Sequence, residues 1–355
     1  MPRTLPPEIL DHIVDNLYDE PIALKACCLV SKSWVERSQR HLFACVELDS
    51  IAGSSVESWM NAFPDPSALP ARYARSLGVR DPGVAFVNVR AWIRSFRRVE
   101  ELSVDMLGSV ELRGVSLLQF HGLSPTLKSL RFANITTPTP EIIGLICSFP
   151  LLEDLSLEII SESDTDGWAA PPTSPKLTGS LRLNGKNRSV VRGLLKLPNG
   201  LHFSKIRVLC HVAEVDSRTI MDLVSKCSHT LESIHLKYYT PTSTTLPPLD
   251  LSNAVKLKYM RFGWGGADIR WITTTLQTVR PEILQQVTVV LNATPVYIPT
   301  EELSWDWHQL DHLLVQLWTA HSVVPRVLYE DTRERFLHLL LPELTRRGFV
   351  KGKRQ

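Results

Sequence analysis

The sequence predicts an α/β fold with three parts: a small three-helix module, a solenoid of repeats with a parallel sheet and helices on its convex side, and a helical C-terminal cap. Three observations predict it. Residues 4–43 contain three short amphipathic segments. An apolar-x-x-apolar-x-apolar motif then recurs about every 26 residues, as in repeat proteins. Several copies follow apolar residues at helical spacing.

The three-helix module is predicted for residues 1–48. Pro6 and Pro7 suit a helix start, because proline is tolerated in the first helical turn. Leu10, Ile13 and Leu17 then form an apolar stripe, and Pro21 separates this helix from the next. Three helices in about 40 residues expose more apolar surface than they can bury among themselves. Part of that surface must therefore contact another element or another protein.

The repeats define the second part. Each copy of the motif has a middle apolar residue, and nine of these anchors lie 25 to 28 residues apart: Leu77, Leu102, Leu130, Leu155, Leu181, Ile206, Ile234, Met260 and Val287. One helix–strand unit cannot bury its own apolar face, whereas stacked units share a continuous core. We therefore predict a leucine-rich-repeat-like solenoid over residues 74–298, preceded by a connecting segment, 49–73. The Asn or Cys usual three positions after the last strand leucine is missing, so we expect a divergent solenoid.

The solenoid is expected to end near residue 290, where the motif stops. Residues 299–350 carry two apolar helical faces, one through Trp307, Leu310 and Leu314 and one around Leu340. We interpret them as a helical C-terminal cap, which solenoids require. Residues 351–355 read as a frayed basic tail.

A row of cations is predicted on the concave face. Residues between the anchors point away from the core, and five of them are basic or histidine: Arg131, Arg182, Arg207, His235 and Arg261. We hypothesise that this row binds an acidic or phosphorylated segment of a partner protein, because arginine can contact such groups bidentately. The alternative is that the cations only keep the sheet surface soluble, with Asp105, Asp154 and Glu158 nearby.

Composition argues against several other classes. The net charge is only +2, from 39 basic and 37 acidic residues, so no overall field favours nucleic acid or a membrane. No stretch approaches the about 18 apolar residues of a transmembrane helix, and the N-terminus lacks the apolar region of a secretory signal. The six cysteines form no C-x-x-C pair, so we expect no disulfide framework or metal site. We expect a cytoplasmic or nuclear protein without a cofactor.

An enzyme is the first alternative. The chain contains no nucleophile elbow, P-loop or metal-protease motif. Its glycine cluster, Phe262–Gly266, lacks phosphate-binding residues, and Cys210-His211 and Cys227-x-His229 need folding to assemble any site. We predict no catalytic residue.

The N-terminal module resembles a known family. The order Leu5-Pro6-x-Glu8-Ile9-Leu10, then Leu24, Leu29-Val30-Ser31 and Trp34, resembles the F-box, especially that of fungal F-box proteins, whose box runs into a short strand like Leu42–Val46. The resemblance implies a substrate-recognition subunit of an SCF-type cullin–RING ubiquitin ligase, with its F-box on the Skp-type adaptor and its repeats on a substrate protein. It assigns the adaptor contact to Leu5, Pro6, Ile9, Leu10, Ile13, Leu24, Leu29, Val30 and Trp34.

Two alternatives remain open. About half of these nine residues could instead hold the three helices together, since every small module needs a core. The chain could also be an F-box and repeat scaffold without a role in ubiquitination, because fold does not determine function.

Overall fold

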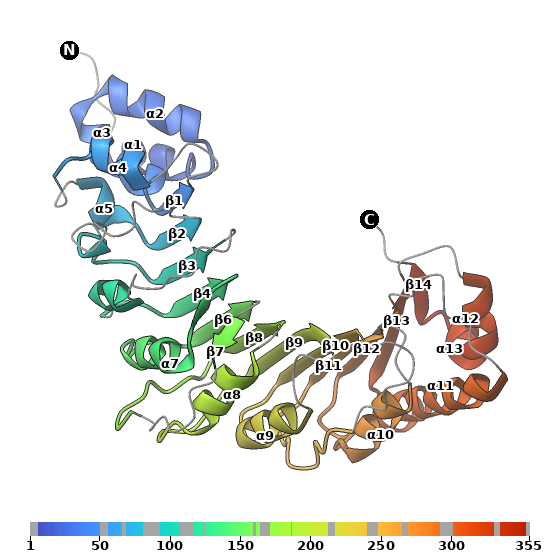
Figure 1. Cartoon of the computed structure of the whole chain (residues 1–355). Coiled ribbons are helices and arrows are strands. Elements are labelled where there is room, and N and C mark those ends of the chain that lie inside the picture. Colours follow the sequence, from blue (N-terminus) through green and yellow to red (C-terminus); the bar gives the residue numbers. More distant parts are fainter. Residues whose placement is uncertain are drawn as a thin grey trace. The chain divides into compact units, whose positions relative to one another are not determined.

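The computed structural model describes most of the chain. The described residues are 6–49, 56–65, 69–80, 93–106, 117–123, 125–158, 161–163, 171–185, 187–211, 217–239, 248–264, 269–291, 301–329 and 334–352. The chain forms two compact units, unit 1 (Met1–Leu152) and unit 2 (Glu153–Gln355). In both, helices accompany parallel strands (Figure 1). The predicted α/β solenoid-like class is therefore confirmed.

Unit 1 begins with three helices and continues into a parallel sheet. Its elements are α1 (Pro7–Asp15), α2 (Pro21–Val30), α3 (Lys32–Leu42), β1 (Cys45–Asp49), α4 (Val56–Ala62), α5 (Leu69–Tyr73), β2 (Ser76–Arg80), β3 (Glu101–Asp105), the 3-10 helix η2 (Leu117–Leu123), β4 (Ser129–Ala133), β5 (Thr136–Pro138) and α7 (Thr139–Cys147).

The three N-terminal helices begin and end where local chemistry favours it. Proline occupies the first turn of both α1 and α2, where its missing N–H costs no helical hydrogen bond. Ser31 caps α3, since its side chain accepts a hydrogen bond from the Ser33 backbone N–H at 3.3 Å. Both α1 and α2 pack against α3. The three helices predicted within residues 4–43 are thus present.

The strands of unit 1 are parallel and in register. They follow the order β1-β2-β3-β4, and the anchors Leu77, Leu102 and Leu130 lie opposite one another. One prediction was wrong: Leu42 and Phe43 end α3, and the strand begins at Cys45. This strand, β1, pairs with β2, so the sheet begins within residues 1–48, before the predicted connecting segment, which itself holds α4 and α5.

Unit 2 continues the alternation of strands and helices. Its elements are β6 (Asp154–Glu158), β7 (Ser161–Ser163), β8 (Ser180–Asn184), α8 (Arg188–Leu195), β9 (Lys205–His211), α9 (Ser217–Cys227), β10 (Ser233–Tyr239), β11 (Tyr259–Trp264), α10 (Arg270–Thr278), β12 (Gln286–Leu291), α11 (Glu301–His321), β13 (Val324–Tyr329), α12 (Glu334–Leu340), α13 (Pro342–Arg346) and β14 (Val350–Gly352).

The sheet of unit 2 has one covered face and one open face. Its strands are parallel in the order β6-β8-β9-β10-β11-β12-β13-β14. The helices α8, α9, α10 and α11 lie along one side of these strands (Figure 1). The anchors Leu155 to Val287 are all at most 1% exposed and pair with one another across the strands. Residues between the anchors lie on the opposite side, which we call the open face.

A buried asparagine stabilises the turn after β8. Asn187 is fully buried, and its Nδ2 donates to the carbonyl oxygens of Asn184 at 2.9 Å, Leu157 at 3.3 Å and Gly185 at 3.4 Å. Because Leu157 belongs to β6, this amide ties the turn after β8 to the strand beside it in the sheet. Asn187 lies one position later than the Asn sought in the sequence, four residues after Leu183.

The C-terminal part differs from the predicted helical cap. Its helices α11, α12 and α13 are present, but β13 and β14 extend the sheet beyond residue 290. Lys351 and Gly352 belong to β14, so the predicted frayed tail is partly a strand, and residues 353–355 lie outside the described part. Buried Asp311 of α11 accepts from the N–H groups of Glu343 and Leu344 at 2.9 and 3.0 Å, which fixes the start of α13.

Candidate functional site

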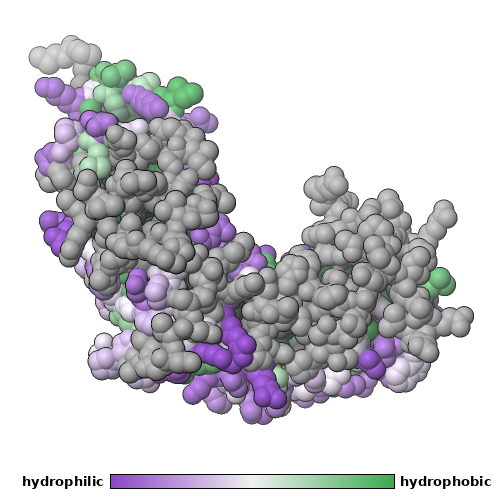
Figure 2. All heavy atoms as spheres, viewed as in Figure 1, coloured by the Kyte–Doolittle hydropathy of each residue, from purple (hydrophilic) through white to green (hydrophobic). Residues whose placement is uncertain are grey.

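Exposed apolar side chains gather on the first two helices. Among the described residues, twelve large hydrophobic side chains are exposed, and six of them lie on or between α1 and α2: Ile9, Ile13, Tyr18, Ile22, Leu29 and Val30. Figure 2 shows hydrophobic atoms over the N-terminal helices, at the top of the view. Such a concentration of exposed apolar side chains is typical of surfaces that bind another protein. We call these six residues the apolar surface.

The residues predicted to contact an adaptor divide into three groups. Pro6, Ile9, Ile13, Leu29 and Val30 are exposed, and Leu29 reaches 89%. Leu10 and Trp34 are half-buried. Leu24 is only 1% exposed, so it lies in the core of the module, as the alternative interpretation allows for about half of these residues.

Two further outcomes concern the apolar surface. Leu5 lies outside the described residues. Ile22 and Tyr18 were missed, although Ile22 is 84% exposed. Ile22 could have been identified from its helical spacing, because Ile22 and Leu29 are seven residues apart and share a face of α2.

Ionic contacts hold α1 against α3 and so fix part of the apolar surface. Arg37 of α3 donates to both carboxylate oxygens of Asp15 on α1 and reaches Asp11 at 3.0 Å. His41 of α3 contacts the Asp15 carboxylate at 2.8 Å. These contacts, with Arg37 first, hold the pKa of Asp15 well below its usual range, and the Asp15 carboxylate raises the pKa of Arg37. The exposed face of α1 is therefore presented on a fixed helix.

The second candidate surface is a row of cations on the open face of unit 2. The sheet register places Arg182 of β8 beside Arg207 of β9, and His235 of β10 between Arg207 and Arg261 of β11. Thr288 of β12 and then Arg326 of β13 continue the line. Neighbouring strands are about 4.8 Å apart. We call Arg182, Arg207, His235, Arg261 and Arg326 the basic row.

The structure brings together four of the five predicted partner-binding residues. Arg182, Arg207, His235 and Arg261 occupy four adjacent strands of unit 2. Arg131 is exposed on β4 of unit 1 and is not part of this row. Arg326 was missed because it belongs to a strand that the repeat motif did not reveal.

Few acidic side chains lie near the basic row to neutralise its positive charge. The open-face positions of β8 to β13 carry no Asp or Glu. The nearest carboxylates of the sheet, Asp154 and Glu158, are on β6, and Asp154 accepts hydrogen bonds from Ser180 N–H at 2.6 Å and Ser180 Oγ at 2.7 Å. Within the described residues, Arg182, Arg207 and Arg326 make no ion pair. The open face is therefore positively charged over several strands, although the chain is nearly neutral.

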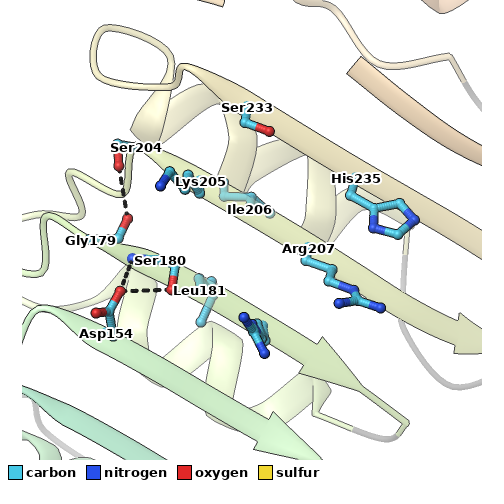
Figure 3. Close-up of a pocket in the computed structure, with 11 residues that line it drawn as sticks. Asp154, Gly179, Ser180, Leu181, Ser204, Lys205, Ile206, Arg207, Ser233 and His235 are labelled. Carbon is cyan, nitrogen blue, oxygen red and sulfur yellow. Dashed lines mark hydrogen bonds between the residues drawn. The ribbon is translucent and has the colours of Figure 1, made fainter. Parts of the chain in front are cut away.

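A shallow hollow of about 490 Å³ lies along the first half of the row. Its lining includes Arg182, Lys205, Arg207 and His235, with Asp154 at one end. Figure 3 shows Arg207 and His235 side by side on adjacent strands, with Asp154 hydrogen-bonded to Ser180 at the other side. The hollow is open to solvent and is lined mostly by polar and charged residues.

His235 is neutral at physiological pH. Burial, followed by the charges of Arg261, Arg207 and Lys237, lowers the pKa of His235 to about 4. The Nε of Arg261 next to it is buried and has no hydrogen-bond partner among the described residues. A buried donor without a partner is uncommon, and an acceptor bound at the open face would satisfy it.

The described residues provide little for other chemistry. No group of His, Cys, Asp and Glu among them is arranged to hold a metal ion, and no helix in this part of the chain has the length and apolarity to span a membrane. Burial raises the pKa of the Cys147 and Cys227 thiols to about 11 each, so neither is a nucleophilic thiolate at neutral pH.

Comparison with known proteins gives no further guide to these two surfaces. No protein-family model matches the chain, and no curated protein matches it significantly.

Proposed function

We propose that this protein is a substrate-recognition subunit of an SCF-type cullin–RING ubiquitin ligase. In this proposal the three-helix module is an F-box that binds a Skp-type adaptor, and the open face of the repeats holds a partner protein. The observation that supports it most is the apolar surface: of the twelve large hydrophobic side chains that are exposed in the described part of the chain, six lie within residues 9–30. The F-box-like order of residues in this segment supports the same assignment.

The apolar surface suits a stable protein contact. Ile9 and Ile13 are one turn apart on α1, and Ile22 and Leu29 are two turns apart on α2, so each helix presents an apolar face. Interfaces of this kind derive most of their binding energy from a few buried anchors. The helix is also pre-ordered by the Arg37–Asp15 contacts, which lowers the entropy cost of binding.

The open face suits a second, separate partner. Repeat sheets bind partners along their exposed strands, and the basic row gives this one a distinct charge. Because the apolar surface is in unit 1 and the basic row is in unit 2, one chain offers a different surface to each partner, as a substrate receptor requires.

Co-purification with a Skp-type adaptor tests the proposal. Leu29→Ala/Val30→Ala removes two exposed anchors at the end of α2, each worth about 1–4 kcal/mol when buried in an interface. The double variant should therefore bind the adaptor at least about tenfold more weakly. Leu339→Ala is the matched control, because Leu339 is 69% exposed on α12 and its loss should leave adaptor binding unchanged.

Two results would contradict the proposal. The first is a folded wild-type chain that never co-purifies with the adaptor. The second is equal loss of binding in the double variant and the Leu339→Ala control, which would indicate non-specific hydrophobic association. If the adaptor binds as expected, ubiquitin transfer to a captured protein distinguishes a substrate receptor from a scaffold.

A further inference from the structure

The centre of the basic row combines three features that no other part of the described sheet has. Arg207, His235 and Arg261 lie on three adjacent strands at one register. Neither arginine has an ion-pair partner among the described residues. The buried Nε of Arg261 also has no hydrogen-bond acceptor. These features indicate a site that is incomplete without an anion.

We propose that Arg207, His235 and Arg261 form a binding site for a phosphorylated side chain of the partner protein, with Arg182 as an additional cation. This rests on the proposed function only in assuming that the open face holds a protein. The chemical class of ligand is a phosphate monoester dianion, presented by an extended segment that crosses the strands.

Charge favours a phosphate over a carboxylate. Two guanidinium groups flank His235 at a spacing of about 10 Å between the outer strands, and a third, Arg182, is one strand further. A phosphate monoester carries a charge of about −1.5 to −2 at pH 7 and three acceptor oxygens. It can therefore accept hydrogen bonds from both guanidinium groups at once, whereas a carboxylate has one charge and two oxygens.

The surroundings favour a protein segment over RNA. Single-stranded nucleic acid sites usually combine cations with several aromatic side chains on which bases stack. Among the described open-face positions of β9 to β11, only two are aromatic: Tyr239 at the end of β10 and Tyr259 at the start of β11, whose hydroxyl donates to Gln285 at 2.7 Å. The overall charge of +2 also provides no long-range attraction for a polyanion.

His235 should make anion binding depend on pH. The charged groups that face it are Arg207 and Lys205 on β9, Lys237 on its own strand and Arg261 on β11. A bound dianion would offset the positive field of these groups. The pKa of His235 should then rise from about 4, and the imidazolium would donate a further hydrogen bond to the anion. Binding should therefore take up protons between about pH 4 and pH 6.5.

The test is an NMR titration of the His235 ring on the full chain, with His235→Gln to assign its resonance. Sulfate is the probe, because it is a dianion that does not titrate in this pH range. Sodium chloride and sodium acetate at matched ionic strength are the reference anions. Sulfate should raise the pKa of His235 by about one unit or more, and acetate and chloride should not.

Variants identify the residues responsible. Arg207→Gln and Arg261→Gln should each abolish the sulfate effect. Lys226→Gln should retain it, because Lys226 is an exposed cation on α9, on the covered side of the sheet. Circular dichroism of each variant confirms that it is folded.

Three results would overturn the proposal. A His235 titration that sulfate leaves unchanged would show that the site does not bind a dianion. An equal effect of acetate would show a site for carboxylates. Displacement of sulfate by single-stranded RNA at lower concentration than by a phosphoserine peptide would indicate a nucleic-acid site. Adaptor co-purification is independent of these variants, so failure of the anion site and failure of the proposed function are distinguishable.

Discussion

Replacing Asn187 with alanine should destabilise unit 2 through a loss of hydrogen bonds at the turn after β8. The Asn187 side chain is fully buried and its Nδ2 donates to three backbone carbonyl groups, the shortest contact being 2.9 Å to Asn184. Alanine removes both donors and leaves these carbonyl groups without them. Water cannot replace the amide freely at a fully buried position.

The expected loss of stability follows from the hydrogen bonds that the substitution removes. A buried polar group that loses its partner costs about 1–3 kcal/mol. The Oδ1 of Asn187 is itself buried without a partner, so its removal offsets part of this loss. We expect a net destabilisation of about 1–2 kcal/mol. With a urea dependence of about 3 kcal/mol per molar, this lowers the unfolding midpoint by roughly 0.3–0.7 M.

Urea unfolding followed by circular dichroism measures this difference. Asn253→Ala is the matched control, because Asn253 is exposed, and surface substitutions usually change stability by less than about 0.5 kcal/mol. Asn187→Asp should be less stable than Asn187→Ala, because it removes the donors and also buries a carboxylate. Equal midpoints for Asn187→Ala and the control would refute the assigned role of the amide.

Two further predictions concern the core and the N-terminal module. Ile206→Ala should lower the free energy of unfolding by about 2–5 kcal/mol, because this anchor of β9 is 1% exposed and its loss leaves a cavity in the repeat core. A urea midpoint equal to that of wild type would contradict the place of Ile206 in the core. Asp15 has a folded-state pKa well below its usual value, so its stabilising contribution is fully present above about pH 4 and is lost as the pH falls below it. The urea midpoint of Asp15→Asn should accordingly fall less steeply on acidification than that of wild type, and parallel pH curves would exclude this role.

The strands with regular anchors could be predicted from the sequence, and the irregular ones could not. All nine anchors lie in parallel strands because the motif repeats the alternation that places one face in the core. The register pairs Val287 with Pro325 in β13. Proline lacks an N–H and is disfavoured inside a sheet, and the long helix α11 separates β12 from β13. For these two reasons the repeat motif did not predict β13, and the place of Arg326 in the basic row was missed as well.

The candidate sites were predictable only to the level of the helix or strand. The helical period in residues 5–34 predicts apolar faces, but it does not say which face contacts α3. Leu24 is therefore buried while Leu29 and Val30 are exposed. The cation row could be predicted more completely, because side chains alternate across a strand. The depressed pKa of His235 depends on burial and on Arg207 and Arg261, which only the sheet register brings beside it.

Hydrogen–deuterium exchange of the full chain, alone and with a saturating Skp-type adaptor, tests whether the N-terminal helices bind the adaptor. We expect slower exchange in α1 and α2, which carry the apolar surface, and unchanged exchange in β8 to β13, where the basic row lies. Protection of the unit 2 strands by the adaptor, or no protection anywhere in a folded chain, would contradict the assignment of the N-terminal helices to adaptor binding.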